Sequence, residues 1–174
     1  RTVAVIGDST FLHSGITGLM NIVYNKGRST VIILDNSITG MTGHQQNPAT
    51  GKDIRGDAAP AVNLEQLCRA LGVSDVKTVD PFDMPALREA LLASLAFDGP
   101  SVIIARRPCA LLSKARTAPL RVTQSCIGCR RCMGIACPAL IFEAGRARVD
   151  ISLCNGCGLC ASVCPKGAIV KEEM

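Results

Sequence analysis

The stretch Cys154-Asn-Gly-Cys157-Gly-Leu-Cys160-Ala-Ser-Val-Cys164-Pro165 determines how the last part of this 174-residue chain folds. It matches the spacing C-x2-C-x2-C-x3-C-P, in which thiolates bind iron–sulfur clusters. A similar run precedes it: Cys126-Ile-Gly-Cys129-Arg-Arg-Cys132-Met-Gly-Ile-Ala-Cys137-Pro138. The two runs hold eight of the ten cysteines. They predict two [4Fe–4S] clusters and therefore electron transfer.

A cubane cluster needs four thiolates that converge from different directions, and three closely spaced cysteines cover only one face of it. In two-cluster ferredoxins the fourth ligand comes from the opposite run. On that pattern the ligands of the first cluster are Cys126, Cys129, Cys132 and Cys164. The ligands of the second cluster are Cys154, Cys157, Cys160 and Cys137. Zinc sites and disulfide frameworks also use several cysteines, but neither explains three cysteines at two-residue steps, twice, each run closed by Cys-Pro.

The two runs differ in one place. Four residues rather than three separate Cys132 from Cys137. The loop is therefore one residue longer, and we expect the two clusters to differ in hydrogen bonding and potential at this point. No ligand is lost by the insertion.

The composition limits the class of protein. Hydrophobic residues make up 48% of the chain, yet the longest apolar stretches, such as 31–34, are strand-sized and far below a membrane span. The formal charge of +5 counts the cysteines as neutral. Two cubanes with their thiolates add roughly −2 each, so little positive charge remains for nucleic acid. We therefore expect neither a membrane nor a nucleic acid as a partner. Cluster thiolates require a reducing compartment, and no secretory signal is recognised, so we predict a cytoplasmic protein.

Residues 1–105 read as strands that alternate with helices. Short apolar runs predict strands at 3–6, 29–34, 76–79 and 101–105. Apolar residues at helical spacing predict helices at 15–24, 64–71 and 84–97. Asn63 and Asp83 are placed to cap the last two helices, and Cys68 lies on an apolar helix face. This alternation predicts an α/β fold with a parallel sheet.

Changes in composition predict the domain limits. We expect an α/β domain over 1–108 and a linker over 109–121, where Pro, Ser, Lys and Arg accumulate. A small α+β domain follows over 122–174 and contains both cysteine runs. Each half of it is expected to supply a cluster loop, a short helix and a strand. So small a domain needs the clusters as crosslinks.

A second candidate site lies after the first strand. Gly7, Asp8 and Ser9 follow that strand directly, and Asn36 follows the next one. Open α/β sheets bind ligands at the carboxyl ends of their strands, and a helix that begins there favours an anion. A carboxylate, an amide oxygen and a nearby carbonyl can hold Mg²⁺, which also accepts phosphate oxygens. The alternative is an ordinary turn at a strand end.

These residues resemble the thiamine diphosphate motif Gly-Asp-Gly…Asn-Asn, with Ser9 in place of the third-position glycine and Asp35 in place of the first asparagine. The resemblance implies three ligands for Mg²⁺: the side chains of Asp8 and Asn36 and the carbonyl oxygen of Ile38. It implies that Gly7 and Ser9 contact the diphosphate. The loop that closes over the cofactor would contain Gly40, Met41 and Thr42.

The two histidines of the chain, His13 and His44, each lie near a predicted cofactor-binding segment. Either is a candidate catalytic residue, for proton transfer or for binding the substrate. The alternative for each is a structural role as a hydrogen-bonding side chain in a loop.

A thiamine domain followed by a two-cluster ferredoxin-type domain resembles the 2-oxoacid:ferredoxin oxidoreductases. The arrangement is most similar to the C-terminal part of the large (alpha) subunit of indolepyruvate ferredoxin oxidoreductases. The resemblance implies an enzyme of anaerobic metabolism that oxidatively decarboxylates aryl pyruvates such as indolepyruvate. Coenzyme A would take the acyl group, CO2 would leave, and electrons would pass through both clusters to an external ferredoxin. It also implies a second (beta) subunit, and a chain that is a C-terminal fragment with only part of its thiamine domain.

Two other functions fit the same residues. The chain could be a non-catalytic two-cluster electron carrier fused to a degenerate docking domain. It could instead serve a 2-oxoacid oxidoreductase of another specificity, for pyruvate or 2-oxoglutarate.

Overall fold

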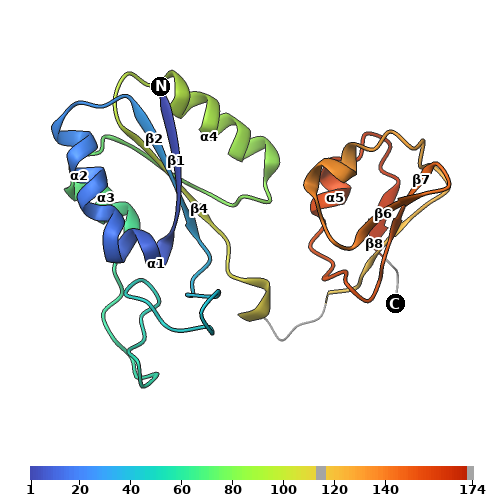
Figure 1. Cartoon of the computed structure of the whole chain (residues 1–174), viewed down its shortest axis with the longest axis horizontal. Helices are drawn as coiled ribbons and strands as arrows, with labels where there is room; N and C mark the ends of the chain where they lie inside the picture. The colour runs from blue at the N-terminus through green and yellow to red at the C-terminus, as the bar shows by residue number, and fades with distance from the viewer. Residues whose placement is uncertain (113–116, 172–174) are drawn as a thin grey trace. The chain divides into compact units, whose positions relative to one another are not determined.

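The computed structural model describes residues 1–112 and 117–171. These residues form two compact units that divide between Cys109 and Ala110 (Figure 1). The predicted linker, 109–121, spans this division. Its residues 113–116 lie outside the described residues, and its last two belong to strand β5 (Leu120–Val122). The predicted domain limits at 108 and 122 stay predictions.

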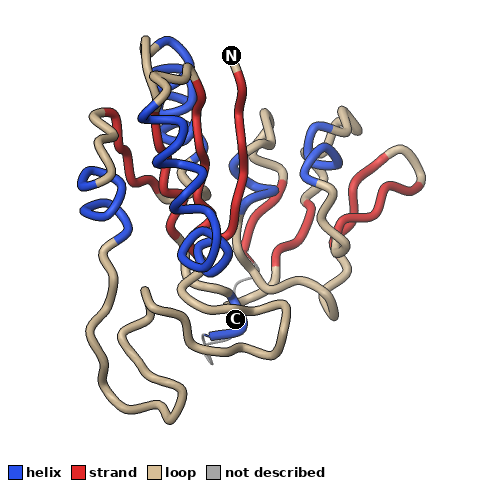
Figure 2. Tube along the Cα trace, turned by 60° about the vertical axis from the view of Figure 1, so that its left-hand side comes forward, coloured by secondary structure: helices blue, strands red, loops and turns tan. Residues whose placement is uncertain are grey.

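The first unit contains a four-stranded parallel sheet, which confirms the predicted fold class. Its strands run in the order β1-β2-β4-β3 and are β1 (Thr2–Gly7), β2 (Ser29–Asp35), β3 (Asp75–Val79) and β4 (Ser101–Arg106). β2 and β4 lie in the middle and are rich in Val and Ile, as strands covered on both faces are. A long loop leaves the sheet at the carboxyl end of β2 (Figure 2).

Helices lie on both sides of this sheet (Figure 1). One continuous helical segment follows β1 and consists of α1 (Asp8–Thr10), the π-helical turn η1 (Phe11–Gly15) and α2 (Ile16–Tyr24). It begins earlier than the predicted helix at 15–24. The reason is that Phe11, which is 1% exposed, already belongs to the core and so extends the apolar side of the helix towards β1.

The two later helices begin at their predicted caps. α3 (Leu64–Ala70) starts where the Asn63 side chain accepts a hydrogen bond from the N–H of Gln66 at 3.0 Å. α4 (Met84–Ala96) starts where the Asp83 side chain accepts one from the N–H of Ala86 at 3.1 Å. Each cap satisfies a backbone donor that the first turn of a helix leaves without a partner.

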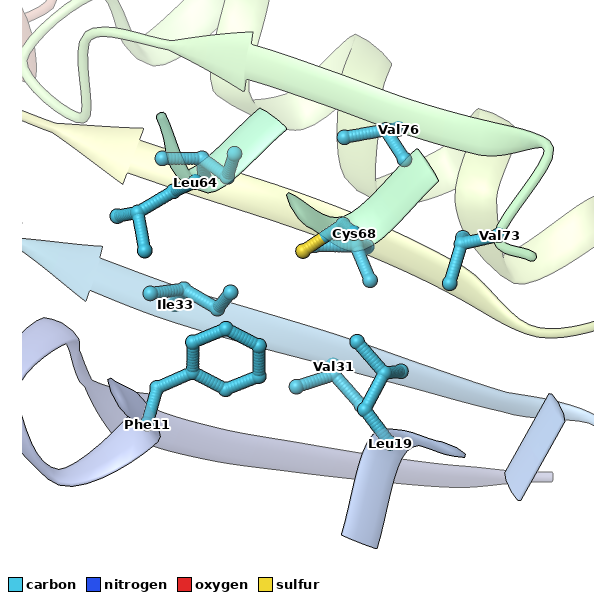
Figure 3. Packing of buried hydrophobic residues seen from close by; sticks show 10 residues of the cluster. Phe11, Leu19, Val31, Ile33, Leu64, Cys68, Val73 and Val76 are labelled. Carbon is cyan, nitrogen blue, oxygen red and sulfur yellow. The ribbon is translucent and has the colours of Figure 1, made fainter. Parts of the chain in front are cut away.

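The main core of the first unit packs helical side chains against β2. Figure 3 shows Phe11 beside Ile33 and Leu19 beside Val31, with Leu64 and Cys68 of α3 on the same side of the sheet. Cys68 is fully buried, and this burial raises the pKa of its thiol to about 11. The thiol therefore stays protonated at neutral pH, and the predicted core position of Cys68 is confirmed.

Gly15 lies where the first helical segment approaches β1. A Cβ at this position would come within 2.8 Å of Ile6 Cδ1 and 2.9 Å of Phe11 Cδ2. A Cβ at Gly18, in α2, would have no such neighbour within 4 Å. The two glycines therefore offer a matched pair that separates close packing from helix propensity.

We predict that Gly15→Ala lowers the free energy of unfolding by about 1–3 kcal/mol, because the added methyl group forces the buried Phe11 ring to move. Gly18→Ala is expected to raise it by up to about 1 kcal/mol, since alanine favours the helix. Urea unfolding followed by circular dichroism measures both changes. A similar effect of the two substitutions would contradict the packing role of Gly15.

The second unit is small and built from two antiparallel strand pairs. β5 pairs with β8 (Ile169–Lys171), and β6 (Leu140–Glu143) pairs with β7 (Arg146–Val149). Three short helical turns complete it: η2 (Ala110–Leu112), η3 (Arg131–Ile135) and α5 (Leu159–Ser162). Its buried residues include Leu120, Leu140 and Ile169 together with Cys132 and Cys160, so the cysteines are part of the core.

The hairpin of β6 and β7 differs from the expectation of one strand in each half. Ala144 and Gly145 form the turn, with φ of 48° and 76°. Two successive residues of positive φ match the twist of a two-residue hairpin. Exposed and buried residues alternate over 146–149, where Ala147 and Val149 are the buried ones. This alternation is typical of a strand and is the sequence feature that identifies β7.

Within the part of the chain that the structure describes, no helix is both long enough and apolar enough to cross a membrane.

Candidate functional site

The first candidate site lies at the carboxyl ends of β1 and β2. These strands are parallel neighbours, and their register pairs Gly7 with Leu34. The residues that follow, Asp8 and Asp35-Asn36, therefore reach the same edge of the sheet, as the sequence predicts. A Cβ added at Gly7 would have no other atom within 4 Å, so the space beside the start of the helix is open.

Asp8 is a buried carboxylate, with 3% of the residue exposed. One oxygen accepts a hydrogen bond from the N–H of Ser9 at 2.8 Å, and the other accepts one from Asn47 Nδ2 at 3.1 Å. None of the salt bridges among the described side chains involves Asp8. Burial raises the pKa of Asp8 above its ordinary value, and the nearby Asp35 carboxylate adds to this. A buried carboxylate without a cationic side chain is costly alone and fits a bound divalent cation.

Asn36 and Ile38 are held in a tight turn after β2. The Asn36 side-chain oxygen accepts a hydrogen bond from the N–H of Ile38 at 3.2 Å, and Asp35 accepts one from the N–H of Ser37 at 3.1 Å. Ser37 has a φ of 60°, and Ile38 is buried. An amide oxygen has two lone pairs, so Asn36 retains one for a ligand. Together with Asp8 these oxygens are donors that suit Mg²⁺.

Asp35 stands where the thiamine motif has an asparagine, and the structure provides a partner for its charge. Asp35 Oδ2 lies 2.6 Å from Arg106 Nε at the end of the neighbouring strand β4. The side chain of Asp35 is 7% exposed and that of Arg106 is 46% exposed. The departure from the motif therefore replaces a neutral amide with a paired carboxylate.

The predicted cofactor loop is a small exposed turn. Thr39 donates its N–H to the carbonyl of Gln45 at 3.0 Å, and Thr42 Oγ1 lies 2.6 Å from Gln45 Oε1. Met41 at its tip is fully exposed. His44, in the same turn, is also exposed. The structure thus places Gly40, Met41 and Thr42 in one turn, and their contact with a cofactor stays a prediction.

His13 lies in η1 and is exposed. Its catalytic role, like that of His44, stays a prediction. Asn47 is the residue that sequence reasoning missed: it is 4% exposed and its partner Asp8 lies 39 residues away in the chain. The dipeptide Asn47-Pro48, a turn signal in a polar segment, is the only sequence feature that marks it.

We predict that Asp8→Asn in the full-length protein lowers the Mg²⁺-dependent affinity for thiamine diphosphate by about 100-fold or more, since a ligand charge is lost. The stability of the metal-free protein should stay unchanged or rise, because a neutral amide is less costly to bury than a carboxylate. Asn47→Ala should weaken binding by about 10–100-fold through the orientation of Asp8. Isothermal titration calorimetry measures the affinities.

The matched control is Asp98→Asn. Its carboxylate is 83% exposed and pairs with Arg28 on the surface, so the same change of charge should leave cofactor binding unaltered. Unchanged affinity in Asp8→Asn would contradict the metal-binding role of Asp8.

The second candidate site is formed by the cysteine runs, whose thiols lie in two groups. Burial raises the pKa of Cys132, and the neighbouring thiolates that add to this rise are Cys126, Cys129 and Cys164. Burial likewise raises the pKa of Cys160 to about 11, with added contributions from Cys157, Cys154 and Cys137. Each group thus contains three cysteines of one run and the last cysteine of the other.

A hollow beside the first group shows the same division. Its lining includes four cysteines, and all of them belong to that group: Cys126, Cys129, Cys132 and Cys164. Backbone donors already point at some of the sulfurs: the N–H of Ala168 lies 3.3 Å from Cys164 Sγ, and that of Gly156 lies 3.4 Å from Cys154 Sγ. Such N–H···S contacts stabilise thiolates that bind iron.

Among the described residues, no three His, Cys, Asp or Glu side chains are arranged to hold a single metal ion. Each thiolate of a cubane binds a different iron atom at a separate corner, so the ligand set that the two groups suit is that of a cluster.

The two runs repeat the same backbone turns. Gly128 and Gly156, each before the second cysteine of its run, have φ of 68° and 69°. A Cβ would lie 2.2 Å from the Gly145 carbonyl oxygen at the first and 2.4 Å from the Ala118 carbonyl oxygen at the second. Both positions therefore exclude any side chain.

Both Cys-Pro pairs form a turn as well. The carbonyl of Cys137 accepts a hydrogen bond from the N–H of Leu140 at 3.0 Å, and that of Cys164 from Gly167 at 3.2 Å. Proline is favoured at the second position of such turns because its φ is already fixed. The turn directs the chain away from the last cysteine of each run.

The extra residue of the first run is absorbed by Ala136. This residue has a φ of 53° and ends η3 directly before Cys137. The corresponding residue before Cys164 is Val163, with a φ of −96°. The insertion is therefore taken up in one left-handed residue, and the cysteine after it still lies with the second group.

We predict that Gly128→Ala and Gly156→Ala each lower the content of iron and labile sulfide, because the added Cβ meets backbone oxygen and distorts the cluster loop. Gly134→Ala is the matched control, since a Cβ there has no neighbour within 4 Å. Chemical analysis of anaerobically purified protein gives the content. Iron equal to that of the unsubstituted protein in both variants would contradict the role of these glycines.

The comparisons with known proteins identify two kinds of domain in this chain. Residues 1–105 match the C-terminal TPP binding domain of the thiamine pyrophosphate enzymes, and residues 147–170 match a 4Fe-4S binding domain. The chain belongs to the thiamine pyrophosphate enzymes and carries a 4Fe-4S binding domain after the thiamine domain. The 4Fe-4S match contains the second cysteine run, and the first run lies before it.

Two relatives indicate which kind of thiamine enzyme this chain is similar to. Indolepyruvate oxidoreductase subunit IorA of Archaeoglobus fulgidus is 46% identical over 176 residues, which is 97% of this chain. Subunit IorA of Methanothermobacter marburgensis is 42% identical over 175 residues, which is 99% of this chain. The chain spans 28% of the length of both relatives. The predicted resemblance to the large subunit of indolepyruvate ferredoxin oxidoreductases is confirmed.

A solved structure shares part of the fold of this chain. The 2-oxoglutarate:ferredoxin oxidoreductase from Magnetococcus marinus superposes with a TM-score of 0.54 at 16% sequence identity. The superposition covers 61% of this chain and 40% of that chain.

Proposed function

We propose that this chain is the cofactor-binding and electron-transferring part of a 2-oxoacid:ferredoxin oxidoreductase subunit that acts on indolepyruvate. The observation that carries the proposal is the presence of two sites in one chain. A buried carboxylate lies at the strand edge of a thiamine domain, and eight cysteines lie in two crossed groups. A protein that only carries electrons does not need the thiamine site. A decarboxylase that performs no oxidation does not need the iron–sulfur clusters.

The first site holds Mg²⁺ and thiamine diphosphate. The side chains of Asp8 and Asn36 and the carbonyl of Ile38 bind Mg²⁺, and Asn47 orients Asp8 by its hydrogen bond. Gly7 and Ser9 contact the diphosphate beside the start of the helix, where backbone N–H groups favour an anion.

The remaining residues of this site act around the cofactor. Gly40, Met41 and Thr42 cover it and exclude water, and His13 and His44 are the candidates for moving a proton to or from the substrate. When bound, thiamine diphosphate supplies the electron sink that decarboxylation of a 2-oxoacid needs.

The second site holds two [4Fe–4S] clusters. The first is bound by Cys126, Cys129, Cys132 and Cys164, and the second by Cys154, Cys157, Cys160 and Cys137. Oxidation of the substrate releases two electrons, and each cubane accepts one at a time. Coenzyme A takes the acyl group, and an external ferredoxin takes the electrons.

Indolepyruvate is favoured as the substrate because the IorA relatives belong to indolepyruvate oxidoreductases and match nearly all of this chain. Their description as subunits also supports a second subunit as a partner. Pyruvate and 2-oxoglutarate are the competing substrates. A pyruvate synthase subunit, PorD of Thermotoga maritima, matches over 54 residues, which is 29% of this chain.

Anaerobic reduction of methyl viologen by the complete complex, with coenzyme A and each 2-oxoacid in turn, tests the proposal. We expect kcat/KM for indolepyruvate to exceed that for pyruvate and 2-oxoglutarate. Cys164→Ser should lower the rate strongly, because it removes a cluster ligand, whereas Cys109→Ser, outside both runs, should not.

Faster turnover of pyruvate or 2-oxoglutarate would overturn the substrate assignment. A complex that binds thiamine diphosphate but reduces viologen with none of these 2-oxoacids would overturn the oxidoreductase function.

A further inference from the structure

We propose that an acidic one-electron carrier docks over the first cluster, so that electrons leave the protein from there rather than from the second cluster. The docking surface is the basic face, formed by Arg130, Arg131 and Lys166. The inference rests on the two proposed clusters and adds the direction of electron flow and the chemistry of the acceptor.

The basic face surrounds the first group of cysteines. All three of its side chains line the hollow that contains Cys126, Cys129, Cys132 and Cys164, and all three residues are exposed. None of them takes part in a salt bridge among the described side chains. A fourth cation, Arg146, precedes the lining residue Ala147 and donates hydrogen bonds to the carbonyls of Thr123 and Gln124, shortly before Cys126. Unpaired charge of one sign is therefore concentrated here.

Within the described part of the chain, the two segments that carry the second group of cysteines, 133–139 and 154–164, bring no such charge. Neither segment contains an Arg, Lys, Asp or Glu, whereas the first run contains Arg130 and Arg131. Cys129 and Cys157 are both exposed, so access to solvent does not distinguish the two groups. The two groups differ instead in the charged side chains of the segments that carry them.

Arg130 brings a positive charge to a backbone position where the second run has a glycine. It occupies the position that Gly158 has in the second run, and it has a φ of 61° where the glycine has 84°. A left-handed conformation is unfavourable for arginine and natural for glycine. The Arg130 guanidinium lies 4.2 Å from the centre of the Phe142 ring, which also lines the hollow. This cation–π contact holds the charge at the rim of the first group.

Two physical effects of these charges act in the same direction. Positive charge beside a cluster stabilises its reduced form and raises its reduction potential, so an electron shared between the two clusters favours the first. The same charges attract an acceptor of negative charge and accelerate its encounter at low ionic strength. The electron and its acceptor therefore meet at the basic face.

Electron transfer from the pre-reduced complete complex tests the inference without any 2-oxoacid. The complex is reduced with dithionite, desalted and mixed in a stopped-flow instrument with either of two acceptors, an acidic ferredoxin or the basic cytochrome c. The test variant is Arg131→Glu combined with Lys166→Glu. The matched control is Arg121→Glu, since Arg121 is exposed but does not line the hollow. Iron and sulfide analysis establishes that each variant holds both clusters.

We expect the test variant to lower the second-order rate with acidic ferredoxin by about tenfold or more at low salt and to weaken its salt dependence. The rate with cytochrome c should rise, and the control variant should change neither rate. Arg130→Gly, which suits the backbone but deletes the charge, should lower the ferredoxin rate in the same direction.

An unchanged ferredoxin rate in the test variant, or equal losses with both acceptors, would overturn the inference. Because the electrons come from dithionite, a complex that fails to oxidise 2-oxoacids would refute the proposed function and leave this test intact.

Discussion

The burial of the Asp8 carboxylate is the constraint on which the first unit depends. The parallel pairing of β1 with β2 brings Asp8 to the edge where Asn36 and Ile38 also lie, and Asn47 returns from a long loop to hold one of its oxygens. No cationic side chain among the described residues compensates its charge, and burial raises its pKa. Asp35, by contrast, is paired with Arg106. The fold therefore keeps one buried carboxylate available for a cation, which is what a Mg²⁺-dependent diphosphate site requires.

The second unit depends on a different constraint, the exchange of one cysteine between two loops. Cys137 groups with the second run and Cys164 with the first, so each proposed cluster would tie together chain segments that are distant in sequence. The buried residues of this unit include Cys132 and Cys160 among only a few aliphatic side chains. A core this small would gain stability from the metal–thiolate bonds of the proposed clusters. Positions 128 and 156 require glycine because these loops pack directly against neighbouring backbone.

Much of this could be read from the sequence because the signals are local. Apolar runs located the strands of the parallel sheet, Asn63 and Asp83 marked helix starts, and cysteine spacing predicted the two groups. The features that sequence reasoning missed depend on contacts between distant segments. Asn47 has no motif of its own and becomes important only because its loop returns to Asp8. The start of the first helix at Asp8 follows from the burial of Phe11. The left-handed conformation of Ala136 arises because the longer loop must still deliver Cys137 to the other group.

We propose that electrons from 2-oxoacid oxidation at the thiamine site pass through the two clusters of this chain. Freeze-quench electron paramagnetic resonance of the complete complex, mixed with indolepyruvate, tests it most directly. We expect the signal of reduced [4Fe–4S] clusters to appear at least as fast as the steady-state turnover measured under the same conditions. Clusters that remain oxidised while CO2 is released, or that become reduced more slowly than turnover, would contradict it.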